Sequence, residues 1–366
     1  MQRNKLHLLI FILLVAEFTT AQSRKIINIP NIAGYQTLKC DFHMHTVFSD
    51  GTVWPTVRVE EAWEEGLDAI SVTDHIEYQP HSKNIVADHN TSFEIAEPLS
   101  KEMNIILIRG AEITRGMPPG HLNALFIKNA NLLERDNVND ALREAHDQGA
   151  FILWDHPGWK KQQPDSTLWW KEHTILYKNN LLNGIEVYNG EFYPEALRWA
   201  KEKKLTMFAN SDAHGPVKTE NSHRPMTLVF AKSRTAGGIK EALFDKRTAA
   251  YFDNTLVGEA SFLNQMFFAS LEIENTPVRL QNKISKTIYI KNNSDLNYEL
   301  ELAQPGIGFE APELALLPAH HISAFEITGN SDEVQLMKTL NIYYKVKNLV
   351  IGNDENLVVT FSIRNL

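Results

Sequence analysis

Short apolar runs alternate with longer amphipathic stretches over the first two thirds of the chain. The apolar runs predict strands at residues 38–43, 68–73, 105–112, 122–127, 150–154, 184–188, 205–210 and 226–231. The amphipathic stretches predict helices at residues 56–65, 91–102, 138–148, 168–178, 194–203 and 238–245. Pro55 and Pro194 suit first helical turns, and Asn137 suits an N-cap. This alternation is typical of βα units that build a mostly parallel sheet or barrel.

The pattern changes after residue 260. Apolar and polar residues then alternate with a period of two at 268–273, 286–290, 298–302, 324–327, 340–346 and 357–363. The pattern predicts a small all-β sandwich over residues 261–366, following a TIM-like α/β barrel over residues 22–260. We expect this sandwich either to contact a glycan or surface or to stabilise the barrel. Stabilisation is favoured because no polar cluster marks the segment.

The first 21 residues have the order of an export signal. Arg3 and Lys5 precede an apolar run at residues 8–15, and small residues precede a cleavage point before Gln22. The apolar run is too short to anchor the protein in a bilayer. We therefore predict a signal peptide over residues 1–21 and a periplasmic or secreted protein without a stable membrane anchor. A buried N-terminal helix is the disfavoured alternative.

The composition of the chain limits the partners and the metal ligands that it can offer. The 366 residues suit one large or two ordinary domains, and a net charge of −9 provides no basic field for a nucleic-acid polymer. The chain has 14 His but a single Cys, Cys40, which excludes an intramolecular disulfide and a cysteine-type zinc site. Any bound metal would therefore be held by His, Asp and Glu.

Potential ligands follow the predicted strands. His43 and His45 end the first strand two residues apart, so both imidazoles can face one side. Asp74 and His75 follow the second strand on opposite faces, and we assign His75 to the metal and Asp74 to the position behind it. The candidate ligands are His43, His45, Asp50, His75, Glu112, His121, His156, Asp212 and His214. Such nitrogen and oxygen donors suit two or three divalent ions, namely Zn²⁺, Mn²⁺ or Fe²⁺.

These motifs resemble those of the PHP (polymerase and histidinol phosphatase) family of metal-dependent phosphoesterases. The matching pieces, between residues 38 and 252, are HMH, SDG, TDH, GAE, GHLNALF, WDHPG and NSDAHG. The resemblance implies a distorted βα barrel of about seven strands with a dinuclear or trinuclear centre. It implies three ligand sets: His43, His45, Glu112 and Asp212; Glu112, His121 and His156; and Asp50, His75 and His214.

The export signal and the sandwich make the chain more similar to exported PHP phosphodiesterases than to cytosolic histidinol phosphatases. We therefore expect hydrolysis of small organic phosphate diesters by a metal-bridging hydroxide. The alternatives are a phosphomonoesterase of the histidinol-phosphatase type and a non-catalytic glycan-binding protein. Amidohydrolase chemistry is disfavoured because such sites usually have a bridging Lys, whereas Glu112 takes that role here.

Residues beyond the ligands are harder to assign from the sequence. Asp155 is expected to support its neighbour His156, and Trp159 either lines a pocket or, with three nearby tryptophans, wedges a loop against the barrel. The catalytic candidates are Asp74, Arg115, Glu191 and His223, and the substrate-binding candidates are Lys218, Arg224 and Trp159, with Lys160 a further loop cation.

Overall fold

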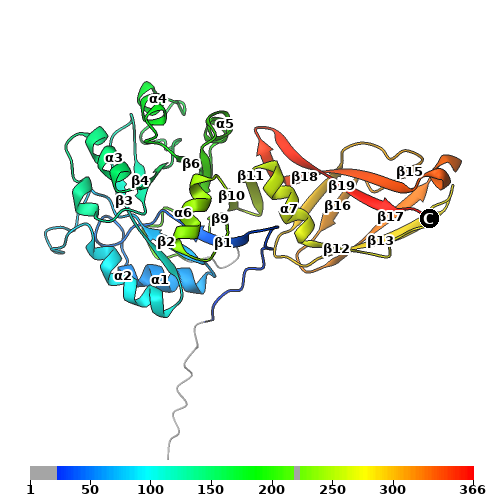
Figure 1. The fold of residues 1–366 in the computed structure, drawn as a ribbon, viewed down its shortest axis with the longest axis horizontal. Coiled ribbons are helices and arrows are strands. Elements are labelled where there is room, and N and C mark those ends of the chain that lie inside the picture. The colour runs from blue at the N-terminus through cyan, green and yellow to red at the C-terminus, as the bar shows by residue number, and fades with distance from the viewer. Residues whose placement is uncertain (1–22, 218–222) are drawn as a thin grey trace, which may run out of the picture.

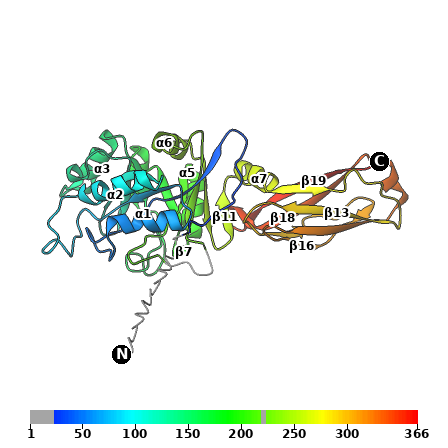
Figure 2. The same ribbon diagram turned by 90° about the horizontal axis from the view of Figure 1, so that it is seen from below.

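The computed structural model describes residues 23–217 and 223–366. Figure 1 shows an elongated molecule with an α/β domain at one end and a β-rich domain at the other, and Figure 2 shows the same arrangement from below. The predicted signal peptide and Lys218 lie outside the described residues. Within the described ranges, no helix combines the length and apolar character that crossing a bilayer requires.

The α/β domain is a distorted barrel. Its wall is formed by β1 (Gln36–Asp41), β2 (Ala69–Val72), β3 (Ile106–Ile113), β4 (Leu122–Leu125), β5 (Phe151–Trp154), β6 (Gly184–Asn189), β8 (Thr206–Ala209) and β9 (Met226–Ala231). Strands β1, β2 and β3 are parallel, as are β5, β6 and β8. Strand β4 runs antiparallel to both β3 and β5, and β9 runs antiparallel to β1. The prediction of a mostly parallel sheet is therefore confirmed, except that β4 and β9 run in the opposite direction.

Side chains close the barrel between β8 and β9. The Thr227 hydroxyl in β9 accepts a hydrogen bond from the Ala209 N–H at 3.1 Å and donates to the Ala209 carbonyl at 2.9 Å. Thr248, in β10 (Thr248–Phe252), donates to the Met207 carbonyl at 2.9 Å. These bonds satisfy backbone groups of β8 that would otherwise be buried without partners.

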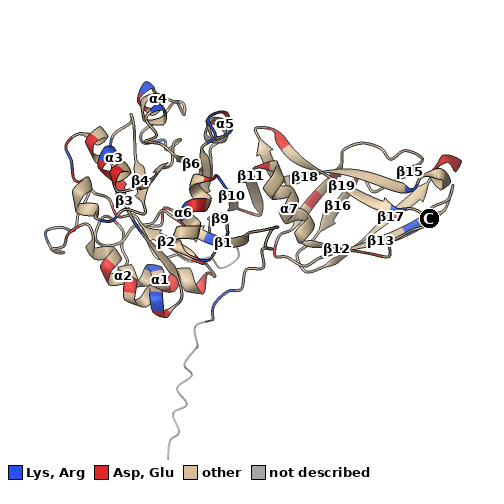
Figure 3. Cartoon of the chain, in the orientation of Figure 1, with Lys and Arg blue, Asp and Glu red and all other residues tan. Residues whose placement is uncertain are grey.

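Helices cover the outside of the barrel: α1 (Pro55–Glu64), α2 (Thr91–Glu102), α3 (Val138–Asp147), α4 (Lys171–Lys178), α5 (Pro194–Lys203) and α6 (Ala236–Phe244), with the 3₁₀ turn η1 (Ala130–Leu133) before α3. Pro55 and Pro194 occupy first turns, and Asn137 caps α3 by accepting from the Asn139 N–H. Helix α4 begins later than residue 168 because the Leu168 N–H is held by the Gln163 side chain. Figure 3 shows basic and acidic residues side by side on α1.

One sequence-based prediction is wrong at the domain junction. The strand expected at 268–273 is divided, because residues up to Ala269 end helix α7 (Ala260–Ala269) and the strand β12 is Leu271–Glu274. Leu263, Met266 and Phe267 are buried with helical spacing, and this burial favours the helix. Strand β11 (Thr255–Gly258), which precedes α7, pairs in parallel with a strand of the second domain and joins the two domains.

The second domain is a sandwich of two antiparallel layers. One layer contains β12, β13 (Ser285–Asn292), β17 (Ile322–Gly329) and β15 (Phe309–Glu310). The other contains β16 (Leu314–Leu317), β14 (Tyr298–Leu302), β18 (Thr339–Gly352) and β19 (Glu355–Arg364), with the 3₁₀ turn η2 (Asp332–Leu336) before β18. Alternate residues such as Ile288 and Ile290 are buried between them. The predicted fold class, an α/β barrel followed by an all-β sandwich, is confirmed.

Candidate metal centre

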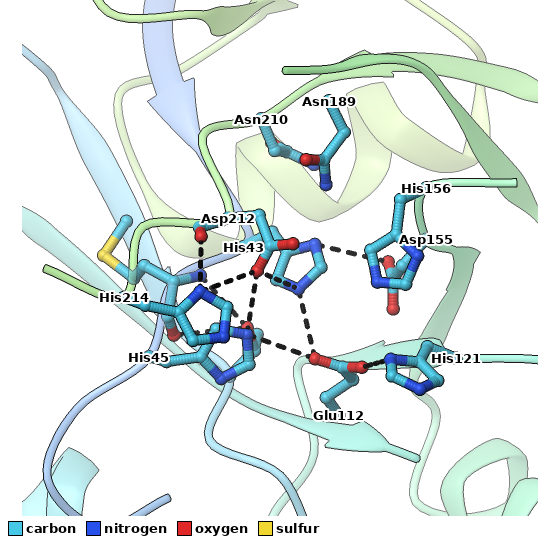
Figure 4. Close-up of polar contacts among 12 residues, drawn as sticks. His43, His45, Glu112, His121, Asp155, His156, Asn189, Asn210, Asp212 and His214 are labelled. Atoms are coloured by element: carbon cyan, nitrogen blue, oxygen red, sulfur yellow. Dashed lines mark hydrogen bonds and ion pairs between the residues drawn. The ribbon is translucent and has the colours of Figure 1, made fainter. Parts of the chain in front are cut away.

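The nine candidate ligands converge at one end of the barrel, where the parallel strands end. Because β4 is reversed, His121 just before it reaches the same end as His156 just after β5. Figure 4 shows seven of the nine side chains facing one another across a small volume. His43, His45 and Glu112 have no exposed surface. The structure therefore brings together residues that are up to 171 positions apart, from His43 to His214.

Backbone pairing fixes the His43 and His45 pair. The His45 N–H donates to the Ala213 carbonyl at 2.9 Å, and the Asp212 N–H donates to the His43 carbonyl at 2.9 Å. Met44 between them is buried in the hydrophobic core, so the two imidazoles point the other way, as the spacing of two predicts. The segments after β1 and β8 thus present their ligands to the same volume.

The turn at residues 49–51 brings Asp50 to the cluster. A Cβ on Gly51 would lie 2.6 Å from the carbonyl carbon of His45, so only glycine permits this close approach. The Asp50 Oδ1 atom consequently lies 3.4 Å from His75 Nε2 and 3.2 Å from His214 Nε2. His45 is stacked against both His75 and His214, with ring centroids 4.3 Å apart in each case.

Glu112 lies at the centre of the cluster. Its Oε2 atom is 3.1 Å from His43 Nε2, 3.2 Å from His45 Nε2 and 3.3 Å from His75 Nδ1. Its other oxygen contacts His121 Nδ1. One buried carboxylate therefore faces four imidazoles, which is the placement that a bridging ligand requires.

Asp212 approaches from the opposite wall. Its Oδ1 atom lies 3.1 Å from His43 Nε2 and 3.0 Å from His45 Nε2. The backbone of Asp212 has φ of 50°, and that of His156 has φ of 28°, both unusual for residues with a Cβ. Strained backbone of this kind is characteristic of functional sites, where the surrounding structure holds it in place.

Donor atoms within 4.8 Å of one another form overlapping groups that resemble the predicted ligand sets. His45 joins Asp50, His75 and His214, while His43 and His45 group with Asp212. Glu112 belongs to one group with His43 and His156 and to another with His75 and His121. The main difference from the predicted sets is that His43, His45 and His75 each belong to more than one group.

The buried polar atoms of the cluster fit divalent ions. In the described part of the chain, His45 Nε2, Asp50 Oδ1, Glu112 Oε1 and Asp212 Oδ1 are buried without a hydrogen-bond partner. Leaving such an atom unsatisfied costs about 1–3 kcal/mol. Because all four converge, and because all are nitrogen or oxygen donors, divalent metal ions would satisfy them.

The pairing of imidazoles with carboxylates shifts the pKa values of His75 and Asp50 in the cluster. Burial alone would lower the pKa of His75, but the negative charges of Glu112 and Asp50 raise it to about 10. Burial alone would raise the pKa of Asp50, but the nearby imidazoles of His214 and His75 hold it well below its usual range. The imidazoles and carboxylates therefore stabilise each other's charged forms.

The sequence-based reasoning missed Glu186, which orients His43. The Oε1 atom of Glu186 lies 3.0 Å from His43 Nδ1, and Oε2 accepts from the His156 N–H at 2.6 Å. Asn189 and Asn210, labelled in Figure 4, donate to the same carboxylate at 2.7 and 2.9 Å. A carboxylate on the far nitrogen of a ligand imidazole is a common support in metal sites. The signal that could have revealed Glu186 is the presence of an acidic residue between Ile185 and Val187, in an otherwise apolar strand.

Asp155 and Asp74 both lie behind the candidate ligands. Asp155 is fully buried beside His43, with 3.8 Å between its Oδ1 and His43 Nδ1, and burial raises its pKa well above the ordinary value. Asp74 accepts from the Thr46 N–H, the Thr46 hydroxyl and the Ser49 hydroxyl, each at 2.7 Å. These bonds occupy both oxygens, so Asp74 holds the turn that carries Asp50 and is not positioned to act on a substrate.

A cavity of about 450 Å³ opens over the cluster. Of the other catalytic and substrate-binding candidates that the structure describes, only Trp159 lines it. Trp154 stacks instead on His173 and Trp199, and Trp169 also packs there, so these residues support the barrel as the wedge interpretation predicts. The cavity is also lined by Tyr78 and Lys161, which the sequence did not single out.

The structure does not bring the remaining described candidates to this cavity. Arg115 pairs with Glu77 at 2.7 Å in a neighbouring cavity. Glu191 is exposed on the two-residue strand β7 (Glu191–Phe192), and the His223 ring stacks on Tyr251 with 3.8 Å between centroids. These three residues were placed near the chemistry because they follow strands, but their loops point elsewhere.

Arg224 also differs from its predicted role. It is 1% exposed, does not line the cavity, and pairs with Asp41 beneath the cluster. Arg224 follows β8 in the sequence as expected, but its guanidinium points inwards to the Asp41 carboxylate. Arg224 therefore supports the site from behind and is not placed to bind substrate.

Known proteins resemble this chain over both domains. A crystal structure of a two-domain protein from Bacteroides vulgatus, containing a predicted PHP-like metal-dependent phosphoesterase, is 44% identical, with a TM-score of 0.89. The match covers 94% of this chain and 100% of that one. An uncharacterized protein of Methanocaldococcus jannaschii is 28% identical over 190 residues, or 49% of this chain and 83% of the relative. A family model described as an Ig-like domain matches residues 271–362.

Proposed function

The chain belongs to the family of PHP-like metal-dependent phosphoesterases, and from this premise we propose that it is an exported phosphodiesterase acting on small organic phosphate diesters. The convergence of nine imidazoles and carboxylates beneath one cavity is the observation that carries the proposal. Divalent ions in such a site lower the pKa of water and neutralise charge on phosphate oxygens.

The chain's own residues prepare this site in three ways. His43, His45, Glu112 and Asp212 would hold one ion, while Glu112, His121 and His156 would hold a second and Asp50, His75 and His214 a third. Glu186 keeps the His43 ring in one orientation through a 3.0 Å contact. The complete burial of His43, His45 and Glu112 excludes water from the floor of the site, which strengthens electrostatic interactions there.

The small positive charge around the cavity favours a diester over a monoester. Lys161 is the single Lys or Arg among the described residues that line it. A diester carries one negative charge less than a fully ionised monoester, so it needs less compensation beyond the metal ions. The walls also include the aromatic rings of Tyr78 and Trp159, which can contact an organic ester group.

Export is supported by the order of charged, apolar and small residues in the first 21 positions. We propose a periplasmic or secreted location, with a small phosphate ester as the partner and no nucleic-acid polymer. Fractionation of cells that produce the full chain tests this location. Recovery of an uncut chain from the cytoplasm would contradict it.

The activity is tested with protein lacking residues 1–21 and loaded with Mn²⁺ or Zn²⁺. Bis(p-nitrophenyl) phosphate and p-nitrophenyl phosphate are compared by kcat/KM, and bound metal is counted in the same samples. We expect two or three ions per chain and a higher kcat/KM for the diester. Preference for the monoester would support a phosphomonoesterase instead, and no turnover of either with metal bound would contradict phosphoesterase activity.

A further inference from the structure

We propose that Tyr78, Trp159 and Lys161 form a subsite for a planar ester group that carries a negative charge. This inference rests on the proposed phosphodiesterase function and names the class of diester: one substituent would be an aromatic or heteroaromatic ring with an anionic group. None of the three residues belongs to the candidate ligands, yet all line the same cavity as those ligands.

The two aromatic rings flank the ligand cluster at different points. The Tyr78 ring centroid lies 5.9 Å from that of His75, and the Trp159 centroid lies 5.6 Å from that of His121. The His75 and His121 rings are themselves 5.8 Å apart. No ring contact joins Tyr78 to Trp159 in the described residues, and both residues line the cavity. A phosphate over the cluster would therefore have an aromatic surface beside it for an ester group.

The loop that carries Trp159 is held rigidly. The Trp159 N–H donates to the His156 carbonyl at 3.0 Å, and the Gln163 side chain donates to the Pro157 carbonyl at 2.7 Å. Gly158 lies so close to the Tyr193 ring that a Cβ would be 2.4 Å from it. A ring fixed in advance loses little conformational entropy when a ligand packs against it.

Tyr78 is anchored through its neighbours while the residue itself stays half-exposed. The Ile76 N–H donates to the Glu112 carbonyl at 2.9 Å, and Glu77 accepts from the Thr114 N–H at 2.7 Å. Tyr78 as a whole residue is 52% exposed. An aromatic ring that remains exposed beside a polar cluster is a typical contact for an organic ligand.

Lys161 supplies the charge. Its Nζ atom lies 5.3 Å from the Trp159 ring centroid, and no carboxylate pairs with it among the described residues. An anionic group at the edge of a ring that rests on Trp159 would lie near this ammonium. Lys160, its neighbour, does not line the cavity and is therefore a matched control.

The inference is tested with three diesters that share p-nitrophenolate as the leaving group and differ in the second ester, which is methyl, phenyl or 4-carboxyphenyl. We expect the metal-loaded wild type to have about tenfold higher kcat/KM for the phenyl than for the methyl diester, the size of one or two aromatic contacts. Trp159→Ala and Tyr78→Ala should each reduce this ratio at least about threefold, while Trp159→Phe and Tyr78→Phe retain it. Two outcomes would overturn the ring subsite. One is an equal kcat/KM for the phenyl and methyl diesters in the wild type, and the other is an equal loss of kcat/KM for both diesters in the Ala variants.

The role of the positive charge of Lys161 is tested with the same three diesters. Lys161→Met should lower kcat/KM for the 4-carboxyphenyl diester about fivefold relative to the phenyl diester, whereas Lys160→Met should not change that ratio. Equal effects of the two variants would overturn the role of Lys161.

A binding measurement separates this inference from the proposed activity. Calorimetry compares two monoanions that have no P–O ester bond to cleave, methyl(phenyl)phosphinate and dimethylphosphinate, on metal-loaded wild type and Trp159→Ala. Tighter binding of the phenyl compound to the wild type alone supports the ring subsite even if no diester is hydrolysed. Equal binding of both compounds to the wild type overturns it even if diesters are hydrolysed.

Discussion

The Nη2 atom of Arg224 lies 3.0 Å from Oδ2 of Asp41, and neither side chain has more than 1% of its surface exposed. Asp41 ends β1 just before His43, and its Oδ2 also accepts from the Ser211 hydroxyl at 2.6 Å. Ser211 directly precedes Asp212. The Asp41 carboxylate therefore ties together the two segments that present His43 and Asp212.

Arg224→Met should destabilise the protein by about 3–5 kcal/mol, because it leaves the Asp41 carboxylate buried without its cation. The free energy of unfolding, measured by denaturant titration, checks this value. The double variant Asp41→Asn with Arg224→Met removes both charges and should recover part of the loss. A loss below 1 kcal/mol in Arg224→Met, typical of surface ion pairs, would contradict the buried pair.

Glu186→Gln should weaken metal binding by about 10–100-fold, because the amide presents the His43 ring with a weaker, neutral partner. Competition with a chelator measures the affinity directly, without any substrate. Glu191→Gln is the matched control, since Glu191 is an exposed glutamate in the next strand. Similar affinities for the two variants would show that Glu186 does not support the site.

Asp212→Asn should reduce the metal-dependent activity by more than about 100-fold, since it alters a proposed direct ligand and not only a proposed support. The fold should persist because the backbone bond from the Asp212 N–H to the His43 carbonyl does not involve the carboxylate. Metal content and circular dichroism, measured with the activity, distinguish loss of an ion from unfolding. Full activity would exclude Asp212 from the ligand set.

His173 should make stability depend on pH. Burial lowers the pKa of this imidazole to about 4, compared with 6.5 for the free side chain. Its Nδ1 accepts from the Trp170 N–H, and its Nε2 faces the Pro119 carbonyl, so the neutral ring is satisfied. Between these two pKa values the unfolded chain binds a proton that the folded chain does not, so stability is lost as pH falls from about 6.5 to 4.

The His173 contribution to this loss is about 3 kcal/mol. His173→Gln should therefore show a shallower decline in the free energy of unfolding over that pH range, although it is less stable at pH 7. Denaturant titrations of both proteins from pH 7 to pH 4 measure the difference. Parallel curves for the two proteins would contradict the buried neutral imidazole.

The fold and the ligand candidates were accessible from the sequence because their signals are local. Alternation of apolar residues depends on neighbours two to four positions away, so α2 and α5 have the predicted bounds. The spacing of His43 and His45 likewise places both on one side of a strand without knowledge of the rest of the chain. Helix α7 was missed because its apolar residues resemble those of a strand over a short window.

Only the tertiary structure decided which other side chains serve the site. His43 and Glu186 are 143 residues apart, and Asp41 and Ser211 are 170 apart, so their pairing leaves no local pattern. Arg224, Glu191 and His223 follow strands at the expected places, yet the direction in which each side chain points depends on packing against distant segments. The sequence by itself determined which residues end each strand, whereas the closure of the barrel determined which of those side chains meet.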